Sequence, residues 1–254
     1  MQKIRYFFQL LKLRLSLTVV FSALTGYFLG ASKINLSQNL SEVFYLALGG
    51  FLVVGSANAF NQILEKDYDR LMKRTACRPL VRGNLQIWES IIFSFIIGLL
   101  GLIMLHQINS YCSYYGLLSI ILYVLCYTPL KRISPISIFV GAIPGAIPFL
   151  LGWVAAYPDK QGFEMASGIL FAIQFFWQFP HFIAISWVQD EDYKKAGFKM
   201  MIGGEKGKSA IIVSIITSLF LMAISVTPFF IKDVRLSMSL SVLIVVVILN
   251  ILFI

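Results

Sequence analysis

Long apolar stretches separated by short polar segments make up most of this chain of 254 residues. A helix needs roughly 20 predominantly apolar residues to cross the hydrocarbon core of a bilayer. Because the stretches have about that length, they predict an all-α, polytopic membrane bundle, with residues 1–254 forming a single transmembrane domain. The eight predicted spans are residues 15–31, 43–64, 89–106, 111–129, 137–156, 165–187, 209–231 and 236–254.

The composition agrees with this prediction, since 58% of the residues are hydrophobic and only 13% are charged. A soluble domain usually carries about 25% charged residues. The basic start, residues 1–14, leads into an apolar stretch without a clear small-residue cleavage site, so we expect no cleaved signal peptide. The same start lacks the character of a transit peptide, which favours a bacterial plasma (inner) membrane over a mitochondrial one.

The basic residues are distributed unevenly between the two sides of the predicted bundle. With the N-terminus in the cytoplasm, 17 of the 21 Lys and Arg residues fall on the cytoplasmic side, which follows the positive-inside rule. Lys33, Lys160, Lys232 and Arg235 fall outside. The net charge of +9 therefore reflects membrane topology together with a local anion site. It does not indicate nucleic-acid binding, because the cations flank membrane spans and form no soluble basic face.

A polar motif begins inside the second predicted span and continues past its end. Asn61, Glu65 and Asp69 recur every four residues, a spacing that places them on one face of a helix, and Arg74 and Arg78 follow. Carboxylate oxygens bind Mg²⁺, and Arg or Lys binds phosphate oxygens. The motif therefore predicts a site for a divalent metal and a diphosphate. Solvated charges at a helix end are the alternative, but they do not explain an aligned Asn within the membrane.

Two predicted cytoplasmic loops are long and polar, residues 65–88 and 188–208, whereas the outer loops are short. Long structured loops on a rigid scaffold often carry function. Both contain carboxylates followed by Lys or Arg, which in the second loop are Asp190, Asp192 and Lys194. This similarity indicates a weak internal repeat, in which both loops face a central cavity open to the cytoplasm and hold one diphosphate through two metal ions. For the second loop, a solvated and orienting role explains the charges equally well.

Two later spans carry further candidate features. Gly141 and Gly145 form a GxxxG pair that allows close helix approach, in a span that also contains two prolines. This segment either only packs, or bends and widens a cavity beside it. Gln178 and His181 lie three residues apart in an aromatic stretch, and a His within a membrane span is a functional candidate. Gln178 is a candidate hydrogen-bond partner of His181, whose alternative role is a structural interhelical hydrogen bond.

Together these motifs resemble those of the UbiA superfamily of intramembrane prenyltransferases, and within it the branch that farnesylates heme. The resemblance covers about residues 55–205, with the motifs in the family's order. The superfamily's Asn-x-x-x-Asp-x-x-x-Asp motif corresponds to Asn61, Glu65 and Asp69. The other matching segments are Arg74-Thr75-x-x-Arg78-Pro79-Leu80, Gly83, Tyr127-Thr128-Pro129-Leu130-Lys131-Arg132, Gly141 to Trp153, Trp177-Gln178-x-Pro180-His181-Phe182, Asp192-Tyr193-x-x-Ala196-Gly197 and Met200.

The resemblance implies that the chain transfers a farnesyl group from farnesyl diphosphate to a vinyl group of heme b, with addition of water, giving heme O and diphosphate. It implies that Mg²⁺ is the cofactor and is bound by Asn61, Glu65, Asp69 and Asp192. It implies that the leaving diphosphate is neutralised by Arg74, Arg78, Lys131 and Arg132. For heme contacts it indicates Trp177, Gln178, His181 and Tyr193, with His181 as the main candidate.

The chain departs from the family's pattern at several points. Position 65 is Glu where Asp is commoner, which changes the metal geometry there. The second loop has no strict Asp-x-x-x-Asp motif, since the residues four positions after Asp190 and Asp192 are not acidic. The family has nine spans, whereas the apolar pattern predicts eight. The sequence stops at Ile254 within an apolar run, so either the protein is short at its C-terminus or the sequence is incomplete.

Three other functions share part of this pattern. A prenyltransferase acting on a quinone precursor has the first motif, but the segment 177–182 argues against it. A cation-coupled transporter uses buried acids to bind a cation in transit, whereas Arg74 and Arg78 favour an anionic ligand. A heme-binding assembly factor without catalysis is the third. For the farnesyltransferase we expect a lipid bilayer as surroundings, and proteins of the heme A pathway or of terminal-oxidase assembly as candidate partners.

Overall fold

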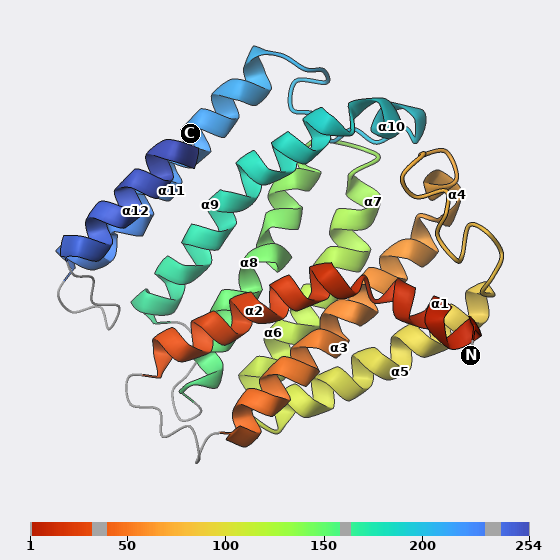
Figure 1. Ribbon diagram of the computed structural model, residues 1–254, viewed down its shortest axis with the longest axis horizontal. Helices are drawn as coiled ribbons and strands as arrows, with labels where there is room; N and C mark the ends of the chain where they lie inside the picture. Colours follow the sequence, from red (N-terminus) through yellow and green to blue (C-terminus); the bar gives the residue numbers. More distant parts are fainter. Residues whose placement is uncertain (1, 32–39, 158–163, 232–239, 254) are drawn as a thin grey trace.

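The computed structural model describes residues 2–31, 40–157, 164–231 and 240–253. These residues form helices joined by loops and include no strand, which confirms the all-α class (Figure 1). The helices are α1 (Gln2–Leu10), α2 (Leu13–Gly30), α3 (Leu40–Leu64), α4 (Lys66–Asp69), α5 (Ile87–His106), α6 (Ser110–Ile121), the π-helix η1 (Leu122–Tyr127), α7 (Thr128–Leu130), α8 (Ser137–Ala155), α9 (Met165–Val188), α10 (Asp190–Lys195), α11 (Lys208–Phe230) and α12 (Leu240–Phe253).

Seven segments in the described part of the chain are long and apolar enough to cross a membrane. They are α2, α3, α5, α8, α9, α11 and the continuous segment Ser110–Leu130, in which α6, η1 and α7 follow one another. These correspond to the first seven predicted spans, and the chain is an integral membrane protein. The eighth predicted span is described only as α12, with 14 residues. Its start lies outside the described residues, as do Lys33, Lys160, Lys232 and Arg235, so the count of eight and the outer positions of these cations stay predictions.

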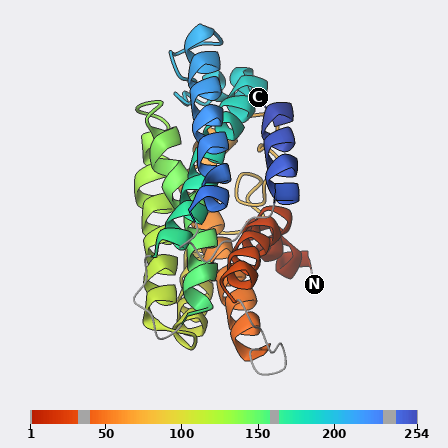
Figure 2. The same ribbon diagram turned by 90° about the vertical axis from the view of Figure 1, so that its left-hand side faces the viewer.

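The centre of the bundle is α8, which is the most buried of the seven spans. The most extensive helix contacts join α3 with α5, α2 with α8, α8 with α9 and α9 with α11. In Figure 2, α12 stands on the far side of α11 from the green helices α6 to α8. Large apolar side chains on the outer faces of the spans are exposed, for example Phe95 at 64% and Leu125 at 65%. Such faces suit contact with lipid, which is as apolar as these side chains.

Two glycines let α2 and α8 touch backbone to backbone. A Cβ atom at Gly152 would lie 1.8 Å from the carbonyl oxygen of Ala23, and a Cβ atom at Gly26 would lie 2.3 Å from that of Phe149. Neither distance is possible between non-bonded atoms, so any larger residue would force these two helices apart. Small residues allow such close helix approach within membranes.

The GxxxG pair of α8 packs closely against neighbouring helices. Gly141 lies against the ring of Tyr127, where a Cβ atom would come within 2.6 Å of a ring carbon. Gly145 lies against the amide of Gln178, where the corresponding distance is 2.8 Å. Both glycines make room for a side chain of a neighbouring helix, whereas the backbone-to-backbone contact of α8 is made at Gly152.

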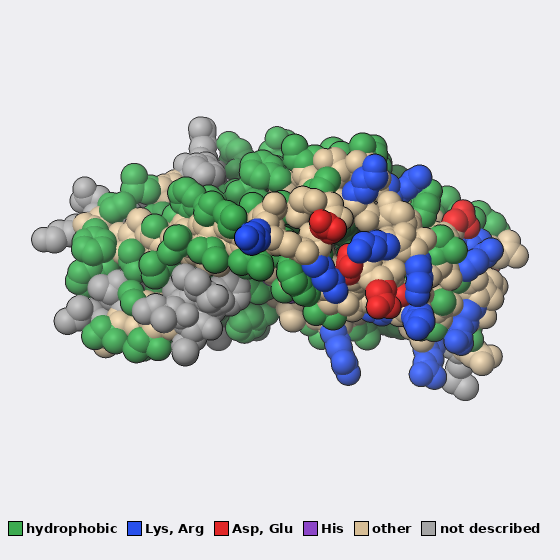
Figure 3. Space-filling view, turned by 90° about the horizontal axis from the view of Figure 1, so that it is seen from above, with side chains coloured by type: hydrophobic (Ala, Val, Ile, Leu, Met, Phe, Trp, Pro, Cys, Tyr) green, Lys and Arg blue, Asp and Glu red, His purple; other side chains and the backbone are tan. Residues whose placement is uncertain are grey.

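Charged side chains gather over one end of the molecule. Figure 3 shows Lys, Arg, Asp and Glu side chains over one half of the face in view, while the other half is mainly hydrophobic. The short helices α4 and α10 lie near each other at this end in Figure 1. Their two loops are joined directly, because the backbone N–H of Arg74 donates to Oδ2 of Asp192 at 3.3 Å. The two polar loops predicted from the sequence therefore meet at one end of the bundle.

Candidate active site

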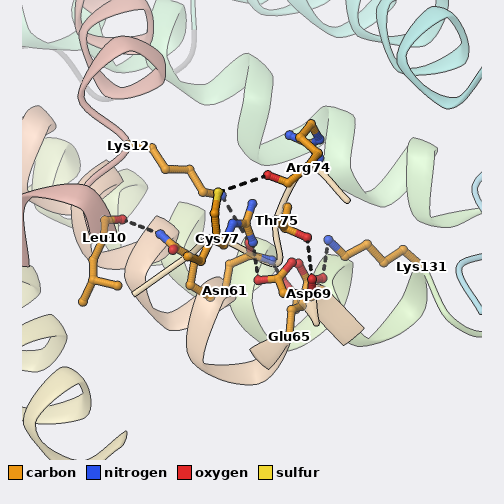
Figure 4. Close-up of polar contacts among 12 residues, drawn as sticks. Leu10, Lys12, Asn61, Glu65, Asp69, Arg74, Thr75, Cys77 and Lys131 are labelled. Atoms are coloured by element: carbon orange, nitrogen blue, oxygen red, sulfur yellow. Dashed lines mark hydrogen bonds and ion pairs between the residues drawn. The ribbon is translucent and has the colours of Figure 1, made fainter. Parts of the chain in front are cut away.

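The motif residues Asn61, Glu65 and Asp69 form a buried row at the polar end of α3. The backbone N–H of Glu65 donates to the carbonyl of Asn61 at 3.0 Å, and that of Asp69 donates to the carbonyl of Glu65 at 2.7 Å. The helical register therefore continues across the junction of α3 and α4, with the three residues one turn apart. They are 1%, 4% and 1% exposed, respectively. Figure 4 shows their side chains grouped together, as expected for residues on one face.

Both carboxylates of this row are paired with cations. Nζ of Lys131, which directly follows α7, forms an ion pair with Oε1 of Glu65. Nη1 of Arg78, from the loop after α4, forms an ion pair with Oδ2 of Asp69. These are two of the cations expected to neutralise a diphosphate, and the structure places both at the acidic row.

Asn61 is held by partners on both ends of its amide. Its Nδ2 donates to Oγ1 of Thr128 at 3.1 Å, and this hydroxyl donates to the carbonyl of Tyr123 at 2.8 Å. Its Oδ1 accepts a hydrogen bond from Nζ of Lys12 at 3.3 Å, although the two residues are 49 positions apart. Figure 4 shows Lys12 and Lys131 approaching the row from opposite sides. Each of the three motif side chains thus has its own cation.

The loop after α4 turns back on itself and so returns Arg78 to Asp69. Oγ1 of Thr75 donates to the carbonyl of Asp69 at 2.9 Å, and the backbone N–H of Arg78 donates to the carbonyl of Thr75 at 3.0 Å. Thr75 is only 1% exposed, so its hydroxyl needs this partner. The short spacing from Asp69 to Arg78 therefore produces a local turn that closes on the row.

Lys131 is positioned by aromatic rings as well as by Glu65. Its Nζ lies 5.1 Å from the ring centroids of both Tyr127 and Phe198. Its carbonyl accepts from the backbone N–H of Lys199 at 2.7 Å, which attaches the second polar loop to the end of α7. Rings at this distance attract a cation and also exclude water from it.

Burial alters the ionisation of the site. It raises the pKa of Asp69 above its ordinary value, although Arg78 beside it acts in the opposite direction. Burial, together with repulsion from Arg78 and Lys131, lowers the pKa of Lys12 to about 7. Burial also raises the pKa of Tyr193 in the second loop. Burial therefore makes the charged forms of these groups costly in free energy. A bound cation and a bound anion would together reduce that cost.

One buried carboxylate oxygen of the row has neither a hydrogen bond nor an ion pair among the described residues. Oδ1 of Asp69 is shielded from solvent and makes no hydrogen bond within the described part of the chain. With the Asn61 amide oxygen and the Glu65 carboxylate, it provides oxygen donors of the kind that Mg²⁺ takes beside substrate phosphates. These residues fit a magnesium ion. No group of three or more His, Cys, Asp or Glu side chains able to hold a metal is assembled among the described residues, so Asp192 is not gathered with Glu65 and Asp69.

A cavity of about 400 Å³ opens beside the row. Its lining residues are Gln9, Lys12, Gln62, Arg74, Thr75, Cys77, Arg78 and Pro79. Three of these are cations, and two of the three, Lys12 and Arg78, also contact the motif. The cavity therefore suits an anion that is bound next to the oxygen donors.

Arg132 was expected at the diphosphate with Lys131, but it faces a second cavity. Its guanidinium group lies over the ring of Tyr68, 4.2 Å from the centroid. The second cavity, of about 340 Å³, is lined by Tyr68, Pro129, Arg132, Ile133, Ala196 and Gly197. It shares no lining residue with the first cavity, so neighbours in the sequence point to different places.

Asp192 and Tyr193 lie at the contact between the two polar loops. Asp192 accepts the backbone N–H of Arg74, whose side chain is exposed and lines the first cavity. The ring of Tyr193 packs against that of Phe198, with centroids 5.8 Å apart. In this structure these two residues connect the loops.

The aromatic stretch of α9 is arranged differently from the expectation in one respect. His181 is half-buried and stacks on Trp177, with ring centroids 4.6 Å apart and an interplanar angle of 17°. Gln178 is 7% exposed and packs against Gly145. No hydrogen bond joins Gln178 to His181 among the described residues, so the expected partnership was wrong. Three helical positions leave the two residues only about 60° apart around the helix, yet Gln178 contacts Gly145 and His181 contacts Trp177.

Lys12 was not predicted as a site residue, because in the sequence it is one of the cations that orient the chain in the membrane. The amine reaches Asn61 through packing of the α1–α2 junction on α3, and neither spacing nor composition carries a signal for that contact. Gln62 was missed too, although it directly follows Asn61 and is 2% exposed.

The sequence profile of the UbiA prenyltransferase family matches residues 19–254. The chain belongs to the UbiA prenyltransferase family. Protoheme IX farnesyltransferases from Flavobacterium psychrophilum and Christiangramia forsetii are both 46% identical to it over 224 residues, covering 88% of this chain and 73% and 72% of theirs. The mitochondrial protoheme IX farnesyltransferase of Arabidopsis thaliana is 37% identical over 198 residues, covering 78% of this chain and 45% of its own. The resemblance seen in the motifs is confirmed.

Solved structures of UbiA proteins share the fold. A digeranylgeranylglyceryl phosphate synthase superposes with a TM-score of 0.78 at 23% identity, covering all of this chain (100%) and 85% of the other. A UbiA homologue from Archaeoglobus fulgidus bound to DMAPP and Mg²⁺ has a TM-score of 0.74 at 16% identity, covering 97% of this chain and 85% of the other. This prenyltransferase family member therefore has the helical membrane fold of its family.

Proposed function

We propose that the protein farnesylates heme b, using farnesyl diphosphate and water and releasing heme O and diphosphate. The observation that carries the reaction class is the buried row Asn61, Glu65 and Asp69, in which each side chain meets a cation. The acceptor is supported by the protoheme IX farnesyltransferases that are 46% identical to this chain. Mg²⁺ is the proposed cofactor, supported by a UbiA homologue that was solved with DMAPP and Mg²⁺.

The cations of the site would act on the leaving group. Mg²⁺, held by Asn61, Glu65 and Asp69, would supply positive charge next to the phosphate oxygens. Arg78 and Lys131 would transfer their contacts from the carboxylates to the diphosphate, because negative charge accumulates there as the bond to the farnesyl C1 breaks. Interactions that strengthen as this bond breaks lower the barrier to ionisation.

The farnesyl cation would then be captured by the acceptor. The electron pair of a heme vinyl group forms the new carbon–carbon bond, and water adds to the resulting cation and loses a proton. Water that reached the farnesyl cation first would quench it. The rings of Tyr127 and Phe198 around Lys131 would exclude water beside the acidic row, where ionisation takes place.

We further propose that α9 contributes the heme contact through His181 and Trp177. The support is a half-buried imidazole stacked on an indole, with no hydrogen bond from His181 to any other described residue. A polar ring within a membrane span is costly unless it has a function or a partner. Heme contacts by Gln178 and Tyr193 stay predictions.

The proposed setting is a bacterial plasma membrane with the polar end in the cytoplasm. The support is the concentration of Lys and Arg at that end, because cytoplasmic segments carry an excess of both. Association with proteins of the heme A pathway or of oxidase assembly stays a prediction.

The deciding experiment is an assay of the purified full chain in lipid nanodiscs with radiolabelled farnesyl diphosphate and heme b. Label should move to heme only when Mg²⁺ is present, and product should be identified by chromatography and mass. A quinone precursor as acceptor tests the related prenyltransferase function. Label transfer to that precursor, or no transfer to heme by folded protein, would contradict the proposal. The activity of Asp69→Ala should fall at least 10- to 100-fold, which is the loss typical of weaker perturbations of metal sites.

A further inference from the structure

The junction of α1 and α2 has an unusual backbone conformation at Lys12. Its φ and ψ are 48° and 60°, in the left-handed region. Lys12 is the one residue other than glycine with positive φ in the described ranges. Such a conformation is costly for a residue with a long side chain and persists only where its surroundings enforce it.

The surroundings that enforce it come from α3. Nε2 of Gln62 donates to the carbonyl of Leu10 at 2.9 Å, which binds the end of α1. Nδ2 of Asn58 donates to Oγ of Ser16 at 3.2 Å, and that hydroxyl donates to the carbonyl of Leu11 at 2.6 Å. The three polar side chains are at most 2% exposed. Helix α3, which ends in the turn that carries Asn61, therefore also clamps the α1–α2 junction.

This clamp places the amine of Lys12 at the motif. Nζ lies 3.3 Å from Oδ1 of Asn61, and the side chain lines the first cavity together with Arg74 and Arg78. Lys12 forms no ion pair with a carboxylate in the part of the chain that the structure describes. Its partner is a neutral amide oxygen, which is a weaker acceptor for an ammonium group than an anion is.

We propose that Lys12 is a further diphosphate-binding residue, whose amine leaves Asn61 for the anion and so frees the amide oxygen for the metal. The identity of the anion rests on the proposed function. Before the anion binds, the amine competes with the metal for Oδ1 of Asn61. After it binds, the amine neutralises the anion and the same oxygen is available. Lys12 therefore couples the binding of metal to the binding of diphosphate: it hinders metal binding in the free site and permits it once diphosphate is bound.

The variant Lys12→Met tests this, with the full chain in phosphatidylcholine nanodiscs. Two probes are used: Mn²⁺ alone, followed by electron paramagnetic resonance, and inorganic diphosphate with Mg²⁺, followed by calorimetry. Affinity for diphosphate should fall about 10- to 100-fold, the range for a charge-assisted hydrogen bond. Affinity for Mn²⁺ alone should stay the same or rise. Arg14→Met is the matched control, because it removes one exposed cation from the start of α2, two residues after Lys12, and should change neither affinity.

The outcomes separate the proposal from its alternatives. Unchanged diphosphate affinity in Lys12→Met would overturn it. Equal losses for both probes would assign Lys12 to the structure of the junction alone. Lys12→Gly provides the second variant, because glycine adopts positive φ without strain and keeps the junction intact while removing the amine. If the unaltered protein fails to bind magnesium and diphosphate at all, then the proposed function fails, and not only the role of Lys12.

Discussion

The ion pair between Arg78 and Asp69 leads to a quantitative prediction about stability. The change is Arg78→Met, which keeps most of the side-chain volume and removes the charge. The Arg78 and Asp69 side chains are 17% and 1% exposed, so the carboxylate would remain buried without its cation. Oδ1 of Asp69 makes no hydrogen bond among the described residues, so Arg78 is the cation that compensates the charge of this group.

Removal of one partner from a buried ion pair costs about 3–5 kcal/mol. Because the guanidinium group is partly exposed, we expect a value near the lower end, about 3 kcal/mol. At about 2–4 °C per kcal/mol for a chain of this size, the melting temperature should fall by about 6–12 °C. The loss should shrink as the pH falls, because Asp69 without Arg78 has a further raised pKa and takes up a proton. The loss of stability caused by Arg78→Met is therefore full at neutral pH and becomes smaller in acid.

Thermal unfolding of the purified protein in nanodiscs, followed by tryptophan fluorescence, measures this shift. Arg82→Met is the matched control, because Arg82 is exposed in the same loop and a surface change of this kind usually stays within about 0.5 kcal/mol. The double variant Arg78→Met/Asp69→Asn should regain stability, because the buried charge is gone, but not activity. A melting temperature for Arg78→Met equal to that of the control would refute the assignment of this pair as a buried and energetically important contact.

Three further predictions concern the metal site, the heme contact and the helix packing. Glu65→Asp should keep much of the activity and Glu65→Gln should lose most of it, because charge matters more than one methylene; equal kcat/KM values would exclude Glu65 as a ligand. His181→Ala should weaken heme binding, measured by absorbance titration, and leave magnesium–diphosphate binding intact. The control His106→Ala, at the exposed end of α5, should change neither kind of binding. An unchanged heme titration for His181→Ala would show that His181 has only a structural role. Gly152→Leu should abolish the monodisperse peak in size-exclusion chromatography, because its Cβ would lie 1.8 Å from a backbone oxygen of α2; Gly50→Leu, where a Cβ meets only Val20 at 4.0 Å, is the control, and equal yields would contradict the backbone contact.

The sequence by itself determined the class of fold and the acidic row. The membrane thickness sets the length of an apolar helix, so seven predicted spans correspond to described segments of suitable length and composition. The helical period of 3.6 residues places Asn61, Glu65 and Asp69 on one face through hydrogen bonds between residues four apart. Both results depend on local helix geometry, which is set by residues close together in the sequence.

Only the tertiary structure decided which cation meets which oxygen. Lys12 and Asn61 are 49 residues apart, and their contact exists because the α1–α2 junction packs on α3. Lys131 and Arg132 are adjacent in the sequence, yet one binds the acidic row and the other lies over Tyr68 in front of a different cavity. Such contacts depend on how helices are placed against one another. That placement is set by backbone approach at glycines such as Gly152 and by buried polar contacts between helices, which a one-dimensional pattern does not encode.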